Sequence, residues 1–315
     1  MLLSLPVELV ERIVRLAVPH EYSSATYLER QDTLRSLCLV CRDLFPLAQR
    51  VLEETVRVSK PGTAKKVGKL LENDAKRANM RALALELYEV EAVKKGCAGL
   101  RDVRLSLMQD FELGWLEQSR NLLRLVLSQC ELAAPYPHLP ALRSMTWSNS
   151  YFAEDEDGRF LSRQHLPTLE DCAFSDRRGG KAAIFSPFFT DLAPSLKTLA
   201  VWDTAVDGGD SRGLATAEHS PAVLVDTAIT TLIFRLPTIL LTYLLLPTRF
   251  RPSVLPHGAL RSSVETFLSA CTARNITVDF EDTDESPGGS GTSPKFGAYV
   301  AEKRVKEKRE TKHGG

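Results

Sequence analysis

The stretch LLRLVLSQCEL, residues 122–132, has leucine at its first, fourth, sixth and eleventh positions and cysteine at its ninth. Successive side chains of a strand point to opposite faces, so Leu125 and Leu127 share one face and Val126 lies on the other. The pattern predicts a short strand with one buried face, and it gives Cys130 a structural role at the turn that follows.

The same spacing of apolar residues recurs along the chain at intervals of 20 to 33 residues. A period in the lower part of this range is typical of leucine-rich repeats, and the copies resemble degenerate repeats of that family. We therefore expect an α/β fold over residues 80–281, an arc of repeats with a parallel sheet, capped by a last helix and a strand with Ile276, Val278 and Phe280. The alternative is a non-repetitive α/β domain. The copies begin at Met80, Leu100, Leu122, Leu142, Leu169, Leu196 and Ile229.

The first 58 residues predict three short amphipathic helices. Pro6 suits a first helical turn, and apolar residues follow it at helical spacing. A second helix is expected over residues 32–43 and a third over residues 46–55, because Pro46 fits a first turn better than a helix interior. So small and apolar a unit requires a partner surface, within this chain or outside it.

These helices resemble an F-box over residues 3–58. The matching positions are Leu5, Pro6, Glu8, Leu9, Ile13, Leu34, Leu37, Val40, Cys41, Arg42, Leu44, Ala48 and Leu52. The resemblance implies docking on the SKP-type adaptor of a cullin-RING ubiquitin ligase. The side chains that it implies for this contact are Leu5, Pro6, Leu9, Ile13, Leu37, Val40, Cys41 and Leu44.

The expected domain order is an F-box over residues 1–58, a linker helix over 59–79, the repeats over 80–281 and a disordered charged tail over 282–315. The tail begins with a linker-like composition and continues with Lys303, Arg304, Lys306, Lys308, Arg309 and Lys312 among glutamates. A solvated tail is favoured over a nuclear-import or nucleic-acid patch, because Glu302, Glu307 and Glu310 interrupt the basic run.

The pair Cys38 and Cys41 is the one C-x-x-C in the chain. Both fall in the apolar stripe of the second helix, where packing is favoured over metal or redox chemistry, since no second ligand pair follows. The histidines are isolated, and no phosphate-binding loop, nucleophile elbow or zinc-protease motif occurs. We therefore expect no catalytic residue, no metal and no cofactor.

Forty basic and forty acidic residues cancel, which gives no overall field for nucleic acid or an anionic membrane. Residues 228–247 are long enough to span a bilayer, but Arg235 and Pro237 lie mid-segment, so a buried strand followed by a turn is expected. The sequence shows no signal peptide, and its scattered cysteines indicate a reducing compartment. The expected location is cytoplasmic, nuclear or both.

The expected function is that of a non-catalytic substrate receptor of an SCF-type ubiquitin ligase, with a protein substrate on the sheet residues that lie between the core leucines. The candidate substrate contacts are Arg104, Ser128, Trp202 and Arg235, together with Glu86, Ser106, Val126, Thr146, Ser148 and Ser175. Trp202 and Arg235 have the side chains most enriched at binding hot spots. The alternatives are a non-degradative F-box scaffold, for example in transcription or at chromatin, and an enzyme on the same fold.

Overall fold

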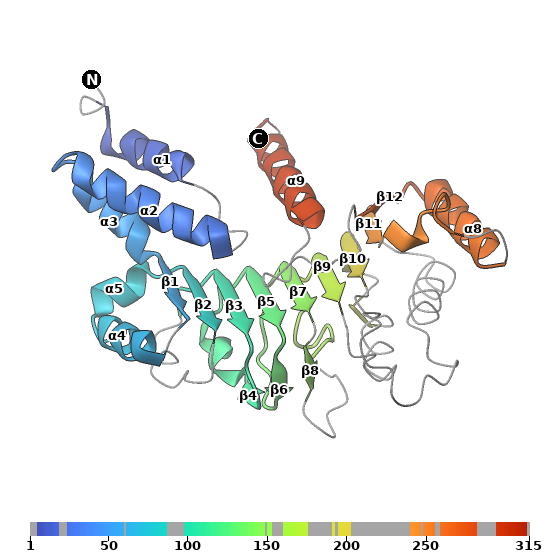
Figure 1. The fold of residues 1–315 in the computed structure, drawn as a ribbon, viewed down its shortest axis with the longest axis horizontal. Coiled ribbons are helices and arrows are strands. Elements are labelled where there is room, and N and C mark those ends of the chain that lie inside the picture. The colour runs from blue at the N-terminus through green and yellow to red at the C-terminus, as the bar shows by residue number, and fades with distance from the viewer. Residues whose placement is uncertain are drawn as a thin grey trace.

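The chain is built around a parallel sheet of nine strands in the order β1-β2-β3-β5-β7-β9-β10-β11-β12 (Figure 1). The computed structural model describes residues 5–18, 24–59, 61–86, 98–148, 150–152, 160–175, 191–192, 195–202, 240–246, 248–255, 259–281 and 294–313. The strands are β1 Thr55–Val58, β2 Ala82–Glu86, β3 Asp102–Ser106, β5 Arg124–Ser128, β7 Ser144–Ser148, β9 Asp171–Ser175, β10 Thr198–Trp202, β11 Tyr243–Leu246 and β12 Thr277–Phe280.

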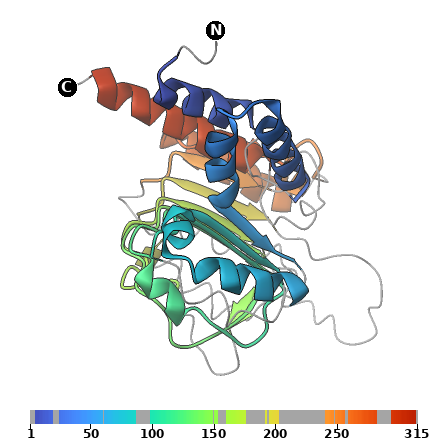
Figure 2. The same cartoon turned by 90° about the vertical axis from the view of Figure 1, so that its left-hand side faces the viewer.

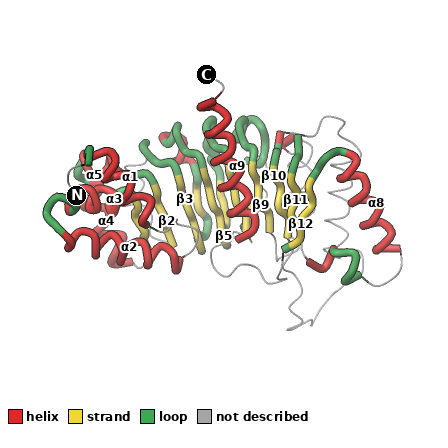
Figure 3. Tube along the Cα trace, turned by 90° about the horizontal axis from the view of Figure 1, so that it is seen from above, coloured by secondary structure: helices red, strands yellow, loops and turns green. Residues whose placement is uncertain are grey.

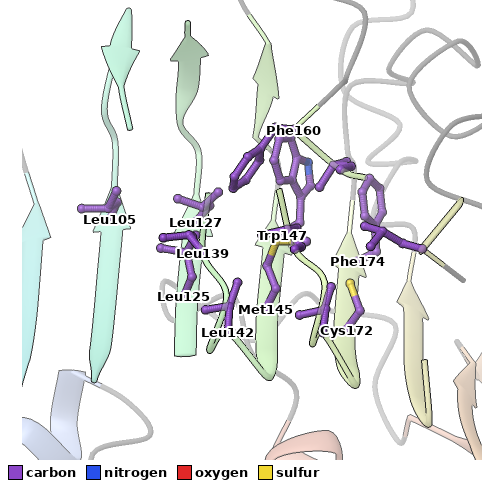
Figure 4. Close-up of a cluster of buried hydrophobic side chains, with 14 of the residues drawn as sticks. Leu105, Leu125, Leu127, Leu139, Leu142, Met145, Trp147, Phe160, Cys172 and Phe174 are labelled. Atoms are coloured by element: carbon purple, nitrogen blue, oxygen red, sulfur yellow. The ribbon is translucent and has the colours of Figure 1, made fainter. Parts of the chain in front are cut away.

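One face of this sheet carries the repeated leucines and their substitutes. The register aligns Val103, Leu125, Met145, Cys172 and Leu199 in one row across neighbouring strands. All five are buried, and they join one continuous core (Figure 4). The predicted repeat is therefore confirmed for the six copies that begin between Met80 and Leu196.

The copy that begins at Ile229 lies outside the described residues. The strand that pairs with β10 is β11, where Leu241, Leu244 and Leu246 supply the same spacing. Leu241 lies 45 residues after Leu196, and this interval is longer than the 20 to 33 residues that separate the copies found in the sequence.

A second, smaller parallel sheet lies beyond the carboxyl ends of β3, β5 and β7 (Figure 1). Its strands are β4 Phe111–Glu112, β6 Glu131–Ala133 and β8 Tyr151–Phe152, in that order. Phe111, Leu132 and Phe152 from these strands belong to the core that the large sheet covers. A 3-10 helix, Gly114–Gln118, adds the buried Leu116.

A repeated pattern of backbone hydrogen bonds joins successive strands at their first residues. The carbonyl oxygens of Arg101, Leu123 and Arg143 each accept two N–H groups from the beginning of the next strand, at 2.9–3.0 Å. Glu54 does the same for Arg81 and Ala82. The sheet therefore begins at β1, inside the segment that the sequence assigned to the three-helix unit.

Three helices precede the sheet, as predicted. They are α1 Val7–Ala17, α2 Ser24–Val40 and α3 Phe45–Glu53. The second helix begins eight residues earlier than expected and ends three earlier, so Cys41 lies in the turn before α3. Pro46 occupies the first turn of α3, where its missing N–H needs no partner.

The segment expected as one linker helix forms two, α4 Pro61–Leu71 and α5 Asp74–Asn79. At the other end, α8 Ala259–Ala273 precedes β12 as predicted. Residues 294–313, expected as part of a disordered tail, form helix α9, Pro294–His313. Helices α1–α3 and α9 lie on the same side of the sheet (Figures 1 and 2).

Candidate functional site

The sheet face opposite the core is the candidate binding surface, and we call it the outer face. It is defined by a row of residues that the strand register places side by side: Arg57, Ala84, Arg104, Val126, Thr146, Ala173, Ala200, Leu245 and Asp279. The row is polar at both ends and apolar from Ala173 to Leu245.

The half of the outer face near the N-terminus carries charges that are paired with one another. Arg57 forms an ion pair with Glu86, and Asp102 lies 3.6 Å from Arg104 and 3.5 Å from Arg124. Each arginine therefore already has a carboxylate partner. A ligand that contacts them would add to existing ion pairs, which makes this half a weaker site for a lone charged group.

The predicted substrate contacts are divided by the structure. Arg104 lies on the outer face with a half-buried side chain, and Ser128 lies there too but is buried. Trp202 ends β10, and its side chain lies outside the described part of the structure, as does the whole of Arg235. The additional candidates Glu86, Ser106, Val126, Thr146 and Ser148 share the face of Arg104, as the alternation predicted.

Helix α9 covers the apolar half of the outer face. In Figure 3 it lies across the strands of the large sheet. Phe296 and Val300 of α9 pack in a cluster with Ala173, Ala200 and Leu245. This cluster is separate from the main core, because it forms on the other side of the same strands.

Two tyrosines stack where α9 crosses β11. The rings of Tyr243 and Tyr299 are 3.7 Å apart between centroids and tilted by 13°. Burial raises the pKa of Tyr243, and the nearby carboxylate of Asp279 raises it further. The phenol stays neutral and lies 3.4 Å from that carboxylate, where it can donate a hydrogen bond.

A buried carboxylate anchors the middle of α9. The Lys303 ammonium donates to Asp171 Oδ1 at 2.9 Å and to Thr198 Oγ1 at 3.2 Å. Arg304 lies 3.7 Å from the other oxygen of Asp171. The Asp171 side chain is 3% exposed, so both cations neutralise a charge that water scarcely reaches. Two residues of the predicted solvated basic tail are thus part of an ion-paired contact.

The sequence contained a signal for this contact. Phe296, Tyr299, Val300 and Lys303 are spaced at i, i+3, i+4 and i+7, which is one face of a helix. The charged residues around them obscure this pattern, because the mean hydropathy of the whole segment is low. The partner of Lys303, Asp171, lies more than a hundred residues earlier, and nothing in the sequence around Asp171 indicates this ion pair.

A second surface lies on α1. Leu9, Ile13 and Leu16 of α1, and Leu5 just before it, are exposed by 40–74%. Val10 and Val14 of the helix are buried, and Val14 packs in the small core of the three-helix unit. Leu9, Ile13 and Leu16 are spaced by four and three residues, so they share one face of the helix. We call these three residues and Leu5 the α1 stripe. The predicted Pro6 is exposed beside it.

The remaining predicted adaptor contacts differ in exposure. Val40 is exposed, and Cys41 is half-buried. Leu37 and Leu44 pack against the small core of the three-helix unit, so they support the fold of that unit more than its surface. Sequence reasoning omitted Leu16, Leu39 and Phe45, all of them exposed.

The two surfaces are joined through one ion-pair cluster. Arg15 on α1 donates to both carboxylate oxygens of Glu54, at 2.7 and 2.6 Å, and to Glu11 at 2.7 Å. The hydrogen bond from Arg15 lowers the pKa of Glu11 below its usual 4.5. The contribution of this hydrogen bond to the stability of the fold is therefore complete above about pH 4.5, and it is lost as the pH falls through the lowered pKa of Glu11.

The described cysteines fall into two groups, three that are buried and two that are half-buried. Cys130 donates its thiol to the carbonyl oxygens of Leu105 and Ser128, which confirms its structural role. Burial raises the pKa of Cys130 to about 11, of Cys271 to about 11, and of Cys172 further. Cys38 and Cys41 are half-buried, and burial raises the pKa of Cys38.

We expect iodoacetamide at neutral pH to modify Cys38 and Cys41 at least about 100-fold faster than Cys130, Cys172 and Cys271, since only thiolates react and burial also blocks access. Peptide mass spectrometry over time would measure the rates. In concentrated urea all five should react alike. Equal rates in the folded chain would contradict the burial described.

Within the described residues, no group of three or more His, Cys, Asp or Glu side chains is placed to hold a metal ion. Among the same residues no helix is long and apolar enough to cross a membrane. Part of the segment tested in the sequence, residues 228–239, lies outside them.

No protein-family profile matches the sequence, and no curated protein matches it. Among solved structures, the chain is similar to an internalin (inlF) from Listeria monocytogenes, with 12% identity and a TM-score of 0.31. The match covers 78% of this chain and 68% of the internalin chain. A likeness this distant says nothing about what the chain binds. The described part of the chain is an α/β structure with a large parallel sheet, and the spacing of its buried leucines is similar to that of leucine-rich repeats.

Proposed function

We propose that this chain is the substrate-recognition subunit of an SCF-type cullin-RING ubiquitin ligase. The three-helix unit binds a SKP-type adaptor, and the outer face of the sheet binds a protein substrate. The observation that carries the proposal is the α1 stripe, with three aliphatic side chains exposed on one face of the helix that matches the F-box motif and Leu5 exposed just before that helix.

A continuous apolar stripe on a small surface helix marks a docking site more often than chance exposure. Val10 and Val14 are buried on another side of the helix, and Arg15 binds Glu54 just before the start of the sheet. A partner on the stripe would therefore be held at a defined position relative to the outer face. A receptor of this kind contributes proximity and needs no catalytic group of its own.

The test is co-expression of the full chain with a SKP-type adaptor, followed by size-exclusion chromatography and a binding titration. We expect a one-to-one complex for the wild-type chain. Leu9→Asp combined with Ile13→Asp should weaken it at least about 100-fold, because charged groups would replace two central apolar contacts. Both residues are exposed, so the melting temperature of the sheet should change little.

Val7→Asp is the matched control. Val7 is also an exposed aliphatic residue of α1, but it lies on the side of the helix opposite Leu9. An aspartate there is compatible with the helix, since the first turn favours carboxylates. Failure of the wild-type chain to bind any SKP-type adaptor would refute the proposal. Adaptor binding without ubiquitylation of bound proteins would favour the scaffold alternative.

A further inference from the structure

The apolar half of the outer face has an occupant from the same chain. Of the face residues, Ala173, Ala200, Tyr243 and Leu245 are buried beneath α9. The contact uses one side of the helix only, and Val305 on another side is exposed. The sheet thus presents a seat for one amphipathic helix.

The seat selects its ligand by two features. The small side chains of Ala173 and Ala200 let a helix approach the strands closely, and the Tyr243 ring offers a stacking surface beside them. Asp171 then requires a cation, because a carboxylate that is 3% exposed is costly without a partner. A helix that fits must carry an aromatic residue, a second aromatic and an aliphatic residue one turn later, and a lysine one further turn on.

The attachment of α9 to the sheet is that of a tethered ligand. Thirteen residues, 281–293, separate the end of β12 from the start of α9. A tether of this length gives an effective concentration on the order of millimolar, so a modest contact is enough to keep the helix seated. The same contact can be exchanged for a better helix without unfolding the main core, from which its cluster is separate.

We propose that the outer face over β9, β10 and β11 is a binding site for an amphipathic helix of a partner protein, and that α9 is its resident competitor. The partner helix has the pattern of Phe296, Tyr299, Val300 and Lys303, with apolar anchors at i, i+3 and i+4 and a basic residue at i+7. That this partner is the ubiquitylation substrate rests on the proposed function; the helix site itself does not.

The test uses the full chain with Phe296→Ala, Tyr299→Ala and Lys303→Ala, which remove the main contacts of α9 with the sheet. We call this variant the disarmed chain. The probe is a fluorescein-labelled peptide of residues 294–313, titrated by anisotropy. The disarmed chain should bind the peptide at least about 30-fold more tightly than the wild-type chain does, because α9 no longer competes. Adding Asp171→Asn to the disarmed chain should weaken binding at least about 10-fold.

The matched control is Val305→Ala, at an exposed residue on the side of α9 opposite Phe296. This chain should bind the peptide as weakly as wild type. A disarmed chain that keeps its near-ultraviolet circular dichroism yet does not bind the peptide would overturn the proposal. A concentration-dependent wild-type dimer that Lys303→Ala abolishes would assign the seat to α9 of a second copy and also overturn it.

Hydrogen exchange in the wild-type chain gives a second measurement if the disarmed chain does not fold. Amides of α9 should exchange at least about 100-fold faster than those of β9 and β10, because the helix leaves its seat without global unfolding. Equal protection would make α9 a fixed part of the fold and refute its exchange. Neither experiment contains the adaptor, so its outcome is independent of the test of the α1 stripe.

Discussion

Replacing Trp147 by alanine lowers the free energy of unfolding by about 4 kcal/mol, the largest effect that we expect from one side chain in the sheet. Trp147 is 1% exposed and is among the largest fully buried side chains of the described residues. Its ring stacks on Phe174 at 6.1 Å between centroids and lies 5.0 Å from Phe152 (Figure 4). Alanine would leave a cavity between the two sheets that the neighbouring strands cannot close.

Urea denaturation followed by far-ultraviolet circular dichroism would measure this loss. Trp147→Phe separates the two roles of the side chain. It retains an aromatic ring but removes the indole N–H that donates to the Ser150 carbonyl at 2.8 Å, so we expect a smaller loss of about 1–2 kcal/mol. Leu123→Ala, at a surface position of the same sheet, should cost under about 1 kcal/mol. A Trp147→Ala chain within 1 kcal/mol of wild type, on the same scale, would contradict the packing described.

Replacing Glu54 by alanine lowers the free energy of unfolding by about 2 kcal/mol. The Glu54 side chain is 8% exposed and accepts hydrogen bonds from both terminal nitrogens of Arg15. Without it Arg15 keeps only Glu11, but Arg15 is partly exposed, so water compensates some of the loss. Because this pair joins α1 to the start of the sheet, the three-helix unit should also unfold before the sheet does.

Hydrogen exchange resolved by segment would show that order, with α1 losing protection in the variant while β5 and β7 keep theirs. Glu53→Ala is the matched control, since Glu53 is the adjacent residue and also forms an ion pair, 3.3 Å from Lys76. It lies outside the contact with α1 and should cost about 0.5 kcal/mol. Uniform loss of protection in the Glu54 variant would show that the helices and the sheet unfold together.

The prediction of the repeats succeeded where local pattern and tertiary packing agree. At Leu122, Leu125 and Leu127 every core position holds a leucine, and the spacing alone specifies a strand and its buried face. The copy predicted at Ile229 lies outside the described residues, and the described strand that follows β10 in the sheet shows the leucine spacing from Leu241, beyond the intervals at which the copies were found. A periodic search finds repeats of regular length and loses those that an insertion has moved.

The three helices at the N-terminus were also predictable, since their apolar faces are encoded within one or two turns. The F-box resemblance implied contacts at Leu5, Leu9 and Ile13, and the structure exposes these three side chains together with Leu16. The strand β1 was missed, because its four residues come directly after the third helix, which was expected to end at residue 55. Only pairing with β2 makes them a strand.

By itself the sequence determined the repeated strand, the face of that strand that is buried and the three helices, because each depends on residues a few positions apart. The tertiary structure decided the place of α9 and the partners of Asp171, Glu54 and Arg15. These contacts join residues far apart in the chain, and a charged residue has no local sign that tells whether water or an opposite charge will surround it.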